Sequence, residues 1–152
     1  METPKTIKEV DFDVEHLYLM DIREEELMGI MTLKDVDRRF EALGHNSVQA
    51  TTFTCDGLIL FSAGYYELWP GVLECWMIPS THVKKAMYTF CKLLKTYVHA
   101  IIEREECHRF QTSAPDDELH ARWMKFLGLD KEGTMKKYTH NGQDYCMYAR
   151  TI

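Results

Sequence analysis

Residues 74–86 read ECWMIPSTHVKKA, and the change of pattern within this stretch decides how the rest of the chain is interpreted. A short apolar run ends at Pro79, two hydroxyl residues follow, and apolar residues then recur three or four positions apart from Val83 onwards. This pattern predicts a strand, a corner and a long helix. Because the first N–H groups of a helix have no partner within it, such a corner is also a place where an anion can bind.

The long helix is expected to bury one stripe of its surface against a sheet, because its charged residues lie off that stripe. The stripe consists of Val83, Met87, Phe90, Leu94, Tyr97, Val98 and Ile101. His99, Glu103 and Cys107 share another face at a spacing that metal ligands can use, but no recognised ligand pattern accompanies them. We therefore interpret this second face as solvated helix surface and predict no metal site.

Before the corner, the sequence predicts three antiparallel strands in series. Residues 47–54 (SVQATTFT) and 57–66 (GLILFSAGYY) are rich in β-branched and aromatic residues. The turn sequence CDG at 55–57 connects these two runs and predicts a hairpin. A Pro-Gly turn at 70–71 then leads into residues 72–78 (VLECWMI), so a three-stranded meander is expected.

The N-terminal part is expected to contain a short strand and two or three helices. Residues 5–10 alternate in polarity like a strand. Residues 11–20 (DFDVEHLYLM) begin with Asp and then place apolar residues at helical intervals. A second helix is expected at 33–43 (LKDVDRRFEAL), where residues 32–35 resemble a capping box and Gly44 stands at the predicted end.

The C-terminal part is expected to form a strand, a helix and a hairpin. Residues 109–114 (RFQTSA) predict the strand, and the helix is expected to run from 115 to 128. MKKYT (135–139) and QDYCMYA (143–149) flank the turn signal HNG at 140–142, which is typical of a hairpin. Two aromatic residues of the helix are expected to fill the core, Trp123 and Phe126.

Composition and charge limit the class of protein. The chain has 152 residues, of which 45% are apolar and 28% charged, so we expect a single domain over residues 1–152. No apolar run approaches the roughly 20 residues of a membrane span, and the N-terminus has no hydrophobic signal region, which favours a cytoplasmic protein. Five cysteines without a CxxC pair argue against a disulfide framework. The net charge of −6 argues against a general nucleic-acid binder.

The order of the expected elements, together with CWMIPS at 75–80 and ARWMKFLGL at 121–129, resembles the GNAT (GCN5-related N-acetyltransferase) fold over nearly the whole chain. This resemblance implies an α/β (α+β) protein with a mixed, mostly antiparallel central sheet of six to seven strands and helices on both faces. With IREEE at 22–26 included, the chain is similar to the small GNAT-like proteins of tailed bacteriophages. One branch of these, in T7-like phages, is a minor internal protein of the capsid.

The resemblance also implies where acetyl-CoA would bind. In GNAT enzymes the fourth strand holds the pantetheine arm, and a glycine-containing loop at the start of the long helix holds the pyrophosphate. The matching cofactor-binding residues are Cys75, Met77 and Ile78 for the strand and His82, Val83, Lys84 and Lys85 for the loop. That loop contains no glycine here, so the resemblance implies weakened binding of acetyl-CoA. Without the cofactor, the corner reads as an ordinary helix capped by Ser80 or Thr81.

Acetyl transfer to an amine needs a base, a donor for the oxyanion and an acid for the leaving thiolate. Glu74 is the candidate catalytic base, with an outward-facing strand residue as the alternative interpretation, and the N–H of Ile78 or of a neighbour is the candidate oxyanion donor. The tyrosine that serves as the acid in many family members corresponds to Met124, which cannot donate a proton. Four other tyrosines are available, and the sequence does not select among Tyr65, Tyr66, Tyr138 and Tyr145.

Two functions remain open from the sequence. The first is an acyl-CoA-dependent N-acyltransferase acting on an amine. The acidic segment 11–45 would suit a cationic acceptor, and a solvent-facing surface is the equal alternative for it. The second is a catalytically inert GNAT-fold protein that acts through protein–protein contacts, in the host cytoplasm or with other virion proteins inside a phage particle. The missing glycines and Met124 favour the second function.

Overall fold

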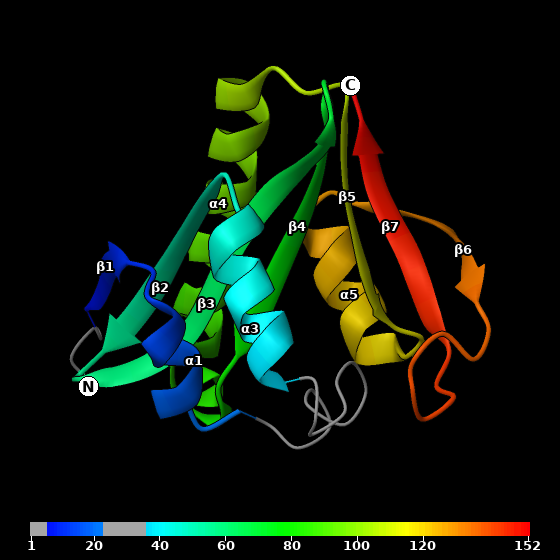
Figure 1. Ribbon diagram of the computed structural model, residues 1–152. Coiled ribbons are helices and arrows are strands. Elements are labelled where there is room, and N and C mark those ends of the chain that lie inside the picture. The colour runs from blue at the N-terminus through cyan, green and yellow to red at the C-terminus, as the bar shows by residue number, and fades with distance from the viewer. Residues whose placement is uncertain (1–5, 23–35) are drawn as a thin grey trace. The chain divides into compact units, whose positions relative to one another are not determined.

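The computed structural model describes residues 6–22 and 36–152, and its strands form a seven-stranded sheet in the order β1-β2-β3-β4-β5-β7-β6 (Figure 1). β4 and β5 pair in parallel, whereas the pairs β1–β2, β2–β3, β5–β7 and β6–β7 are antiparallel. This mixed, mostly antiparallel sheet confirms the predicted fold class. The capping-box pattern predicted at 32–35 lies outside the described residues.

The bounds of the elements are as follows. The strands are β1 (Ile7–Asp11), β2 (Gln49–Cys55), β3 (Leu58–Trp69), β4 (Val72–Pro79), β5 (Arg109–Pro115), β6 (Asp130–Met135) and β7 (Tyr145–Thr151). The helices are α1 (Val14–Leu19), α3 (Val36–Asn46), the 3-10 helix η1 (Thr81–Ala86), α4 (Met87–Glu105) and α5 (Glu118–Phe126).

The described residues divide into two compact units, and β3 and β4 each contribute to both. The first unit takes residues up to 65 together with 76–87, and the second takes 66–75 together with 88–152. The expectation of one domain over residues 1–152 stays a prediction.

In the first unit, α1 begins after an Asp as predicted, but this residue is Asp13, because Asp11 still belongs to β1. The Asp13 side chain accepts the Glu15 N–H at 2.9 Å, and His16 Nδ1 accepts the Asp13 N–H at 3.1 Å. α3, in contrast, does not end at Gly44 but continues to Asn46. Its end is set by Ser47, whose N–H and hydroxyl both donate to the Leu43 carbonyl. Satisfying that free carbonyl stabilises the helix end without a glycine.

The hairpin between β2 and β3 is confirmed. Asp56 (φ 52°) and Gly57 (φ 77°) both adopt positive φ, the conformation of a two-residue turn that matches the twist of the strands. The stacked rings of Phe53 and Phe61, with centroids 4.5 Å apart, lie on the two strands. A separate core cluster of the same unit contains Leu17, Met20, Phe40 and Ile78.

The long helix follows the predicted stripe with one correction at its start. Phe90, Leu94, Val98 and Ile101 are buried along α4, as the spacing predicts. Residues 81–86, however, form the 3-10 helix η1, in which the bonding pattern is tighter than in an α-helix. The corner after β4 therefore does not open directly into an α-helix.

The C-terminal hairpin is displaced from its predicted position. β6 occupies Asp130–Met135, so of MKKYT only Met135 is in a strand, where it pairs with Tyr145. The rest of that segment forms a loop, because the N–H groups of Tyr138 and Thr139 donate to the Gln143 carbonyl. These local bonds close the loop before a strand ladder can extend into it.

α5 begins after Asp117 rather than at Pro115, which still belongs to β5. Trp123 is half-buried, and its ring makes edge contacts with Phe90 and His120. The prediction that Phe126 fills the core is wrong, because this side chain is 45% exposed and carries the Lys95 ammonium over its ring. A cation–π contact of this kind covers one ring face without burying it.

Candidate functional site

Glu74 stands at the end of the ladder that joins β4 to β5. The parallel pairs are Val72 with Arg109, Leu73 with Phe110 and Glu74 with Gln111. One further bond follows, from Thr112 Oγ1 to the Cys75 carbonyl at 3.0 Å. The paired strands thus place the side chains of Glu74 and Gln111 beside each other.

The Glu74 carboxylate accepts two hydrogen bonds within the second unit. The Tyr66 hydroxyl donates to Oε2, and Gln111 Nε2 donates to Oε1 at 3.1 Å. The Glu74 side chain is half-buried. A carboxylate with a donor on each oxygen is held in one orientation, and further lone pairs remain for a third group.

Arg109 extends this cluster across the sheet. Its Nε donates to Gln111 Oε1 at 2.7 Å, and its two terminal nitrogens donate to the Glu132 carboxylate at 3.0 and 2.5 Å. Because Arg109 can only donate, it requires the amide oxygen of Gln111 to face it, which turns the amide nitrogen toward Glu74. We call these five side chains, from β3, β4, β5 and β6, the Glu74 relay: Tyr66, Glu74, Gln111, Arg109 and Glu132.

The protonation of two groups in this region is well defined. Burial, together with the hydrogen bond to Glu74, raises the pKa of Tyr66 well above its ordinary value, so Tyr66 is a neutral donor at neutral pH. Burial also raises the pKa of the Cys75 thiol to about 12. Cys75 is therefore a thiol at neutral pH, and it lacks the thiolate character of a cysteine nucleophile.

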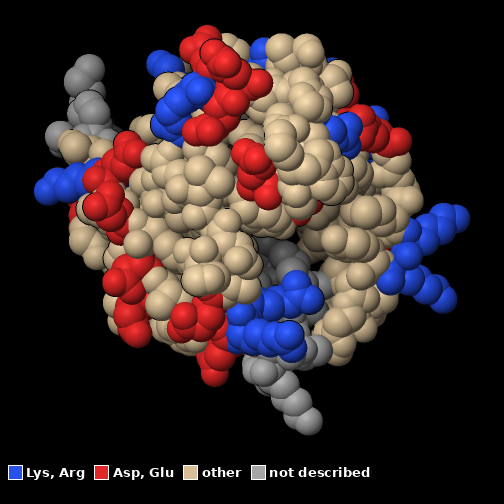
Figure 2. Space-filling model, turned by 45° about the horizontal axis from the view of Figure 1, so that its top comes forward, with Lys and Arg blue, Asp and Glu red and all other residues tan. Residues whose placement is uncertain are grey.

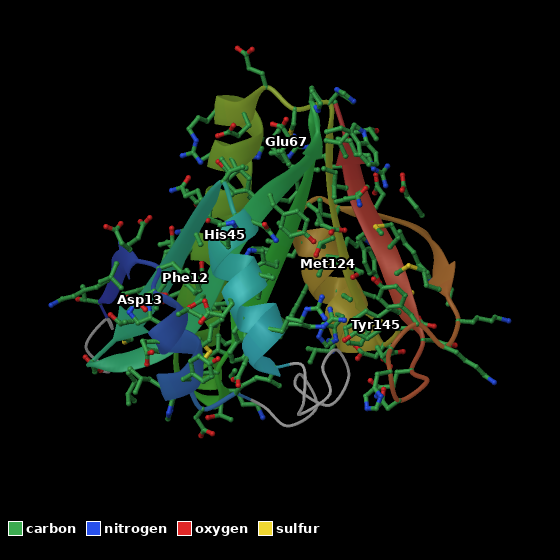
Figure 3. The ribbon with its side chains drawn as sticks, in the orientation of Figure 1. Phe12, Asp13, His45, Glu67, Met124 and Tyr145 are labelled. Atoms are coloured by element: carbon green, nitrogen blue, oxygen red, sulfur yellow. The ribbon has the colours of Figure 1, made fainter. Side chains whose placement is uncertain are left out.

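Among the four candidate tyrosines, the structure brings Tyr66 to Glu74. Tyr65 is 1% exposed and belongs to the first unit, and Tyr145 is 2% exposed with its ring 5.5 Å from that of Tyr138. Figure 3 shows Met124 on α5 and Tyr145 near the start of β7. Sequence reasoning missed Gln111 and Arg109, although their alternation along β5 already placed both on one face.

The corner after β4 lies in the first unit and is closed by Ser80. This residue is 0% exposed; its hydroxyl donates to the Ile59 carbonyl at 2.6 Å, and its N–H donates to the Leu60 carbonyl at 2.8 Å. The same hydroxyl oxygen accepts the His82 N–H at 3.2 Å. Ser80 is thus a fully bonded cap that joins the end of β4 to β3 and to η1.

Asp21 occupies the outer side of the corner. Its carbonyl accepts the Thr81 N–H at 2.9 Å, and its carboxylate accepts the Thr81 hydroxyl at 2.9 Å. The neighbouring Ile22 forms a β-bridge with Ser80. The Val83 N–H in turn donates to the Ser80 carbonyl at 3.3 Å. The N–H groups of Thr81, His82 and Val83 therefore all have acceptors within the protein.

The residues predicted to hold acetyl-CoA differ in their accessibility. Cys75, Met77 and His82 are half-buried, and Lys84 is exposed. Ile78 is 8% exposed and Val83 is 0% exposed. Of Lys85, only the backbone is described. The Val83 side chain is enclosed in the core and its N–H is already bonded, so neither is available to a ligand.

This corner does not fit a diphosphate. A diphosphate binds to a turn through N–H groups that have no other partner, and those of Thr81, His82 and Val83 are already bonded. The Asp21 carboxylate, held by the Thr81 hydroxyl, would also place a negative charge next to the ligand. The corner therefore offers a diphosphate no free N–H group at Thr81, His82 or Val83.

Other surfaces add little chemistry. A shallow hollow of about 360 Å³ on α4 is lined by Lys95, Thr96, His99, Ala100 and Glu103. Within the described ranges, no group of three or more His, Cys, Asp or Glu side chains is placed to hold a metal ion. No described helix is long and apolar enough to cross a membrane. On the face shown in Figure 2, acidic and basic side chains are intermixed.

No protein family model and no curated protein matches this sequence. Solved structures do match its fold. Ard1 from Thermoplasma volcanium is similar over 99% of this chain and 99% of its own, with a TM-score of 0.74 and 10% identity. A second similar structure is the putative acetyltransferase yncA from Salmonella typhimurium, solved with its cofactor acetyl-CoA. The matched region spans 95% of this chain and 93% of yncA, with a TM-score of 0.71 and 13% identity.

A third similar structure is a GNAT-family acetyltransferase from Bacillus anthracis. The matched region spans 95% of this chain and 94% of that protein, with a TM-score of 0.69 and 13% identity. Identities this low leave the shared architecture as the common feature of all three comparisons. The sheet order, the parallel β4–β5 pair and these similarities together show that the chain has the GNAT acetyltransferase fold.

Proposed function

We propose that this chain is an N-acyltransferase that moves an acyl group from a thioester to an amine, with Glu74 as the base. The observation that carries the proposal is the bonding of Glu74, whose carboxylate is held by Tyr66 and Gln111 at the end of the β4–β5 ladder. The GNAT fold supports the reaction class, because structures of this fold include acetyltransferases. In the family pattern, the thioester arm would follow Cys75, Met77 and Ile78 of β4.

The Glu74 relay can supply both proton transfers of this reaction. The amine nitrogen attacks the thioester carbonyl carbon, the C–S bond breaks and an amide forms, while the amine proton passes to Glu74. The departing thiolate takes the hydroxyl proton of Tyr66, and Glu74 returns its proton to Tyr66. Once Glu74 is protonated, the anion that helps to raise the pKa of Tyr66 is gone, so Tyr66 becomes a stronger acid when it is needed.

Glu74→Gln tests this proposal. The substitution keeps the size of the side chain and removes its basicity, so we expect kcat with an acyl thioester and a panel of amines to fall about 100-fold or more, with KM nearly unchanged. Glu67→Gln is the matched control, because Glu67 follows Tyr66 on β3 by one position and is exposed (Figure 3). An unchanged kcat in a folded Glu74→Gln protein would remove Glu74 from the mechanism.

A second candidate function is that of an inert GNAT-fold protein in the particle of a tailed phage, acting through protein contacts. The closed corner at Ser80 and Asp21 favours it, because a protein that no longer binds a nucleotide cofactor has no need for a phosphate cradle. Mass spectrometry of purified particles tests this function. The expected result is a fixed number of copies per particle, and absence of the chain from particles would contradict it.

A further inference from the structure

We propose that the acyl donor of this protein is an acylated pantetheine arm that carries no nucleotide diphosphate, either free or attached to a carrier protein. This inference rests on the proposed acyl transfer and concerns the donor. It starts from the corner between β4 and η1, where a diphosphate does not fit, while Glu74 and its partners retain acid–base groups.

The first argument is that the N–H groups of the corner are occupied. Thr81 donates to the Asp21 carbonyl, His82 to Ser80 Oγ and Val83 to the Ser80 carbonyl. A diphosphate would have to break these bonds before it could form its own. Such an exchange gains little, because each new bond replaces one that already exists.

The second argument is electrostatic. The Asp21 carboxylate is fixed at the corner by the Thr81 hydroxyl at 2.9 Å. A diphosphate brings at least two negative charges to the same place, whereas a free pantetheine arm is uncharged and an arm attached to a carrier protein brings the single charge of its phosphodiester. Asp21 therefore repels a nucleotide-linked donor and leaves a free pantetheine donor unaffected.

The third argument is that the corner cannot easily turn its N–H groups outward. Ser80 is 0% exposed with bonds to Ile59 and Leu60, and Val83 is also 0% exposed. Rotating this turn would break the Ser80 bonds and expose Val83 to water. A glycine would relieve the steric part of this restriction, but residues 80–87 contain none.

The test compares three donors with the same amine: acetyl-CoA, S-acetylpantetheine and an acetylated carrier protein. For the unsubstituted protein, we expect kcat/KM for acetyl-CoA to be no higher than that for S-acetylpantetheine, because the diphosphate adds no favourable contact and is repelled by Asp21. A carrier-protein donor that is markedly better than free S-acetylpantetheine would identify the carrier as the source of the arm, and equal values would identify the free thioester.

Asp21→Asn separates the electrostatic argument from the rest. We expect it to raise kcat/KM for acetyl-CoA about fivefold or more at low salt, an effect that added salt should reduce, and to leave S-acetylpantetheine unchanged. Asp56→Asn is the matched control, since it removes one exposed charge in the β2–β3 turn and Asn tolerates positive φ there. Calorimetric titration with desulfo-CoA gives a readout without turnover, and the gain from Asp21→Asn should appear there as tighter binding.

The outcomes distinguish the two proposals. A preference for acetyl-CoA over S-acetylpantetheine of about 100-fold or more, with no effect of Asp21→Asn on desulfo-CoA binding, would overturn the donor inference and leave the acyltransferase proposal standing. No turnover of any of the three donors across the amine panel would overturn the acyltransferase proposal, and the donor inference with it.

Discussion

At the scale of single residues, Gly64 illustrates how close packing uses the smallest side chain. It lies inside β3, where a glycine weakens a strand unless something approaches it closely. A Cβ at this position would lie 2.7 Å from the Gln49 carbonyl oxygen and 2.8 Å from Trp76 Nε1. The indole nitrogen is in turn fixed by its bond to Ser47 Oγ at 2.8 Å, so Trp76 cannot easily move away.

Gly64→Ala is therefore expected to lower the free energy of unfolding by about 2–3 kcal/mol through overpacking. Gly133→Ala is the control, because a Cβ at Gly133 meets nothing within 4 Å and its φ is ordinary. Urea unfolding of both variants measures the difference. Equal stability of the two would show that the Trp76 ring yields to the added methyl group.

Tyr66 gives a second prediction at this scale, which concerns alkaline pH. The folded protein holds the Tyr66 proton more tightly than the unfolded chain, whose tyrosines titrate at about pH 10. Above that pH the unfolded state loses its proton first, so the free energy of unfolding falls as pH rises toward the folded pKa. Tyr66→Phe removes this contribution, and the fall between pH 8 and pH 11 should become smaller.

Tyr88→Phe is the comparison for this experiment, because Tyr88 is 81% exposed. Urea unfolding at both pH values should show the same alkaline loss for Tyr88→Phe as for the unsubstituted protein. If Tyr66→Phe shows that same loss as well, the bond between Tyr66 and Glu74 does not stabilise the neutral phenol.

At the scale of elements, α5 depends on its cap. The Asp117 carboxylate accepts the His120 N–H at 2.8 Å and contacts His120 Nδ1 at 2.8 and 2.9 Å. Burial alone would raise the pKa of Asp117, but the hydrogen bonds from His120 outweigh it and lower the pKa below its ordinary value. The stabilisation is therefore present above the unfolded pKa and is lost as pH falls through the folded one.

Asp117→Ala is expected to cost about 1–2 kcal/mol of unfolding free energy at pH 7, which is typical for a lost N-cap. The cost should shrink as pH falls below about 4, because the unfolded carboxylate then takes up a proton while the native one is still charged. Asp116→Ala, one position earlier and outside the cap, is the control. Guanidinium unfolding at pH 7 and pH 3 measures both effects, and an equal cost at the two pH values would argue against a charged cap.

At the scale of the whole molecule, the Glu74 relay connects several strands through side chains alone. It starts at Tyr66 on β3 and reaches Glu132 on β6, and Arg109 makes three of its bonds. Arg109 does not touch Glu74, so we regard it as a positioning residue that orients the Gln111 amide. Its paired bonds to Glu132 use the planar geometry of the guanidinium.

Arg109→Lys keeps the charge but loses that geometry, so the Gln111 amide should no longer be fixed. If Glu74 is the base as proposed, we expect kcat with an active acyl donor to fall about tenfold with KM little changed, because a loosely oriented carboxylate would lose its alignment with the amine. Arg122→Lys on the exposed side of α5 is the control. A parallel rise in KM, or no change in kcat, would indicate that Arg109 stabilises the sheet and does not position the Glu74 carboxylate.

The sequence by itself determined the local elements. The hairpin at 55–57, the cap at Ser80, the cap that opens α1 and the buried stripe of α4 all follow from preferences within a few neighbouring residues. Where local bonds compete, two predictions from the sequence were wrong. The bond from Ser47 to Leu43 extends α3 beyond Gly44, and bonds to the Gln143 carbonyl form a loop in place of the strand predicted at 135–139. Within these segments, the sequence left open which of several acceptable local bonds would form.

Only the tertiary structure decided which side chains meet at Glu74 and at the corner after β4. Glu74 receives its donors from residues 8 and 37 positions away, and Asp21 closes the corner from 60 positions away. No periodicity in the chain encodes such pairs, because they depend on which strands are neighbours and in which register they pair. The sequence therefore identified the strand and the corner, and the fold determined that Glu74 has a hydrogen-bond donor on each oxygen while the N–H groups of Thr81, His82 and Val83 are already bonded.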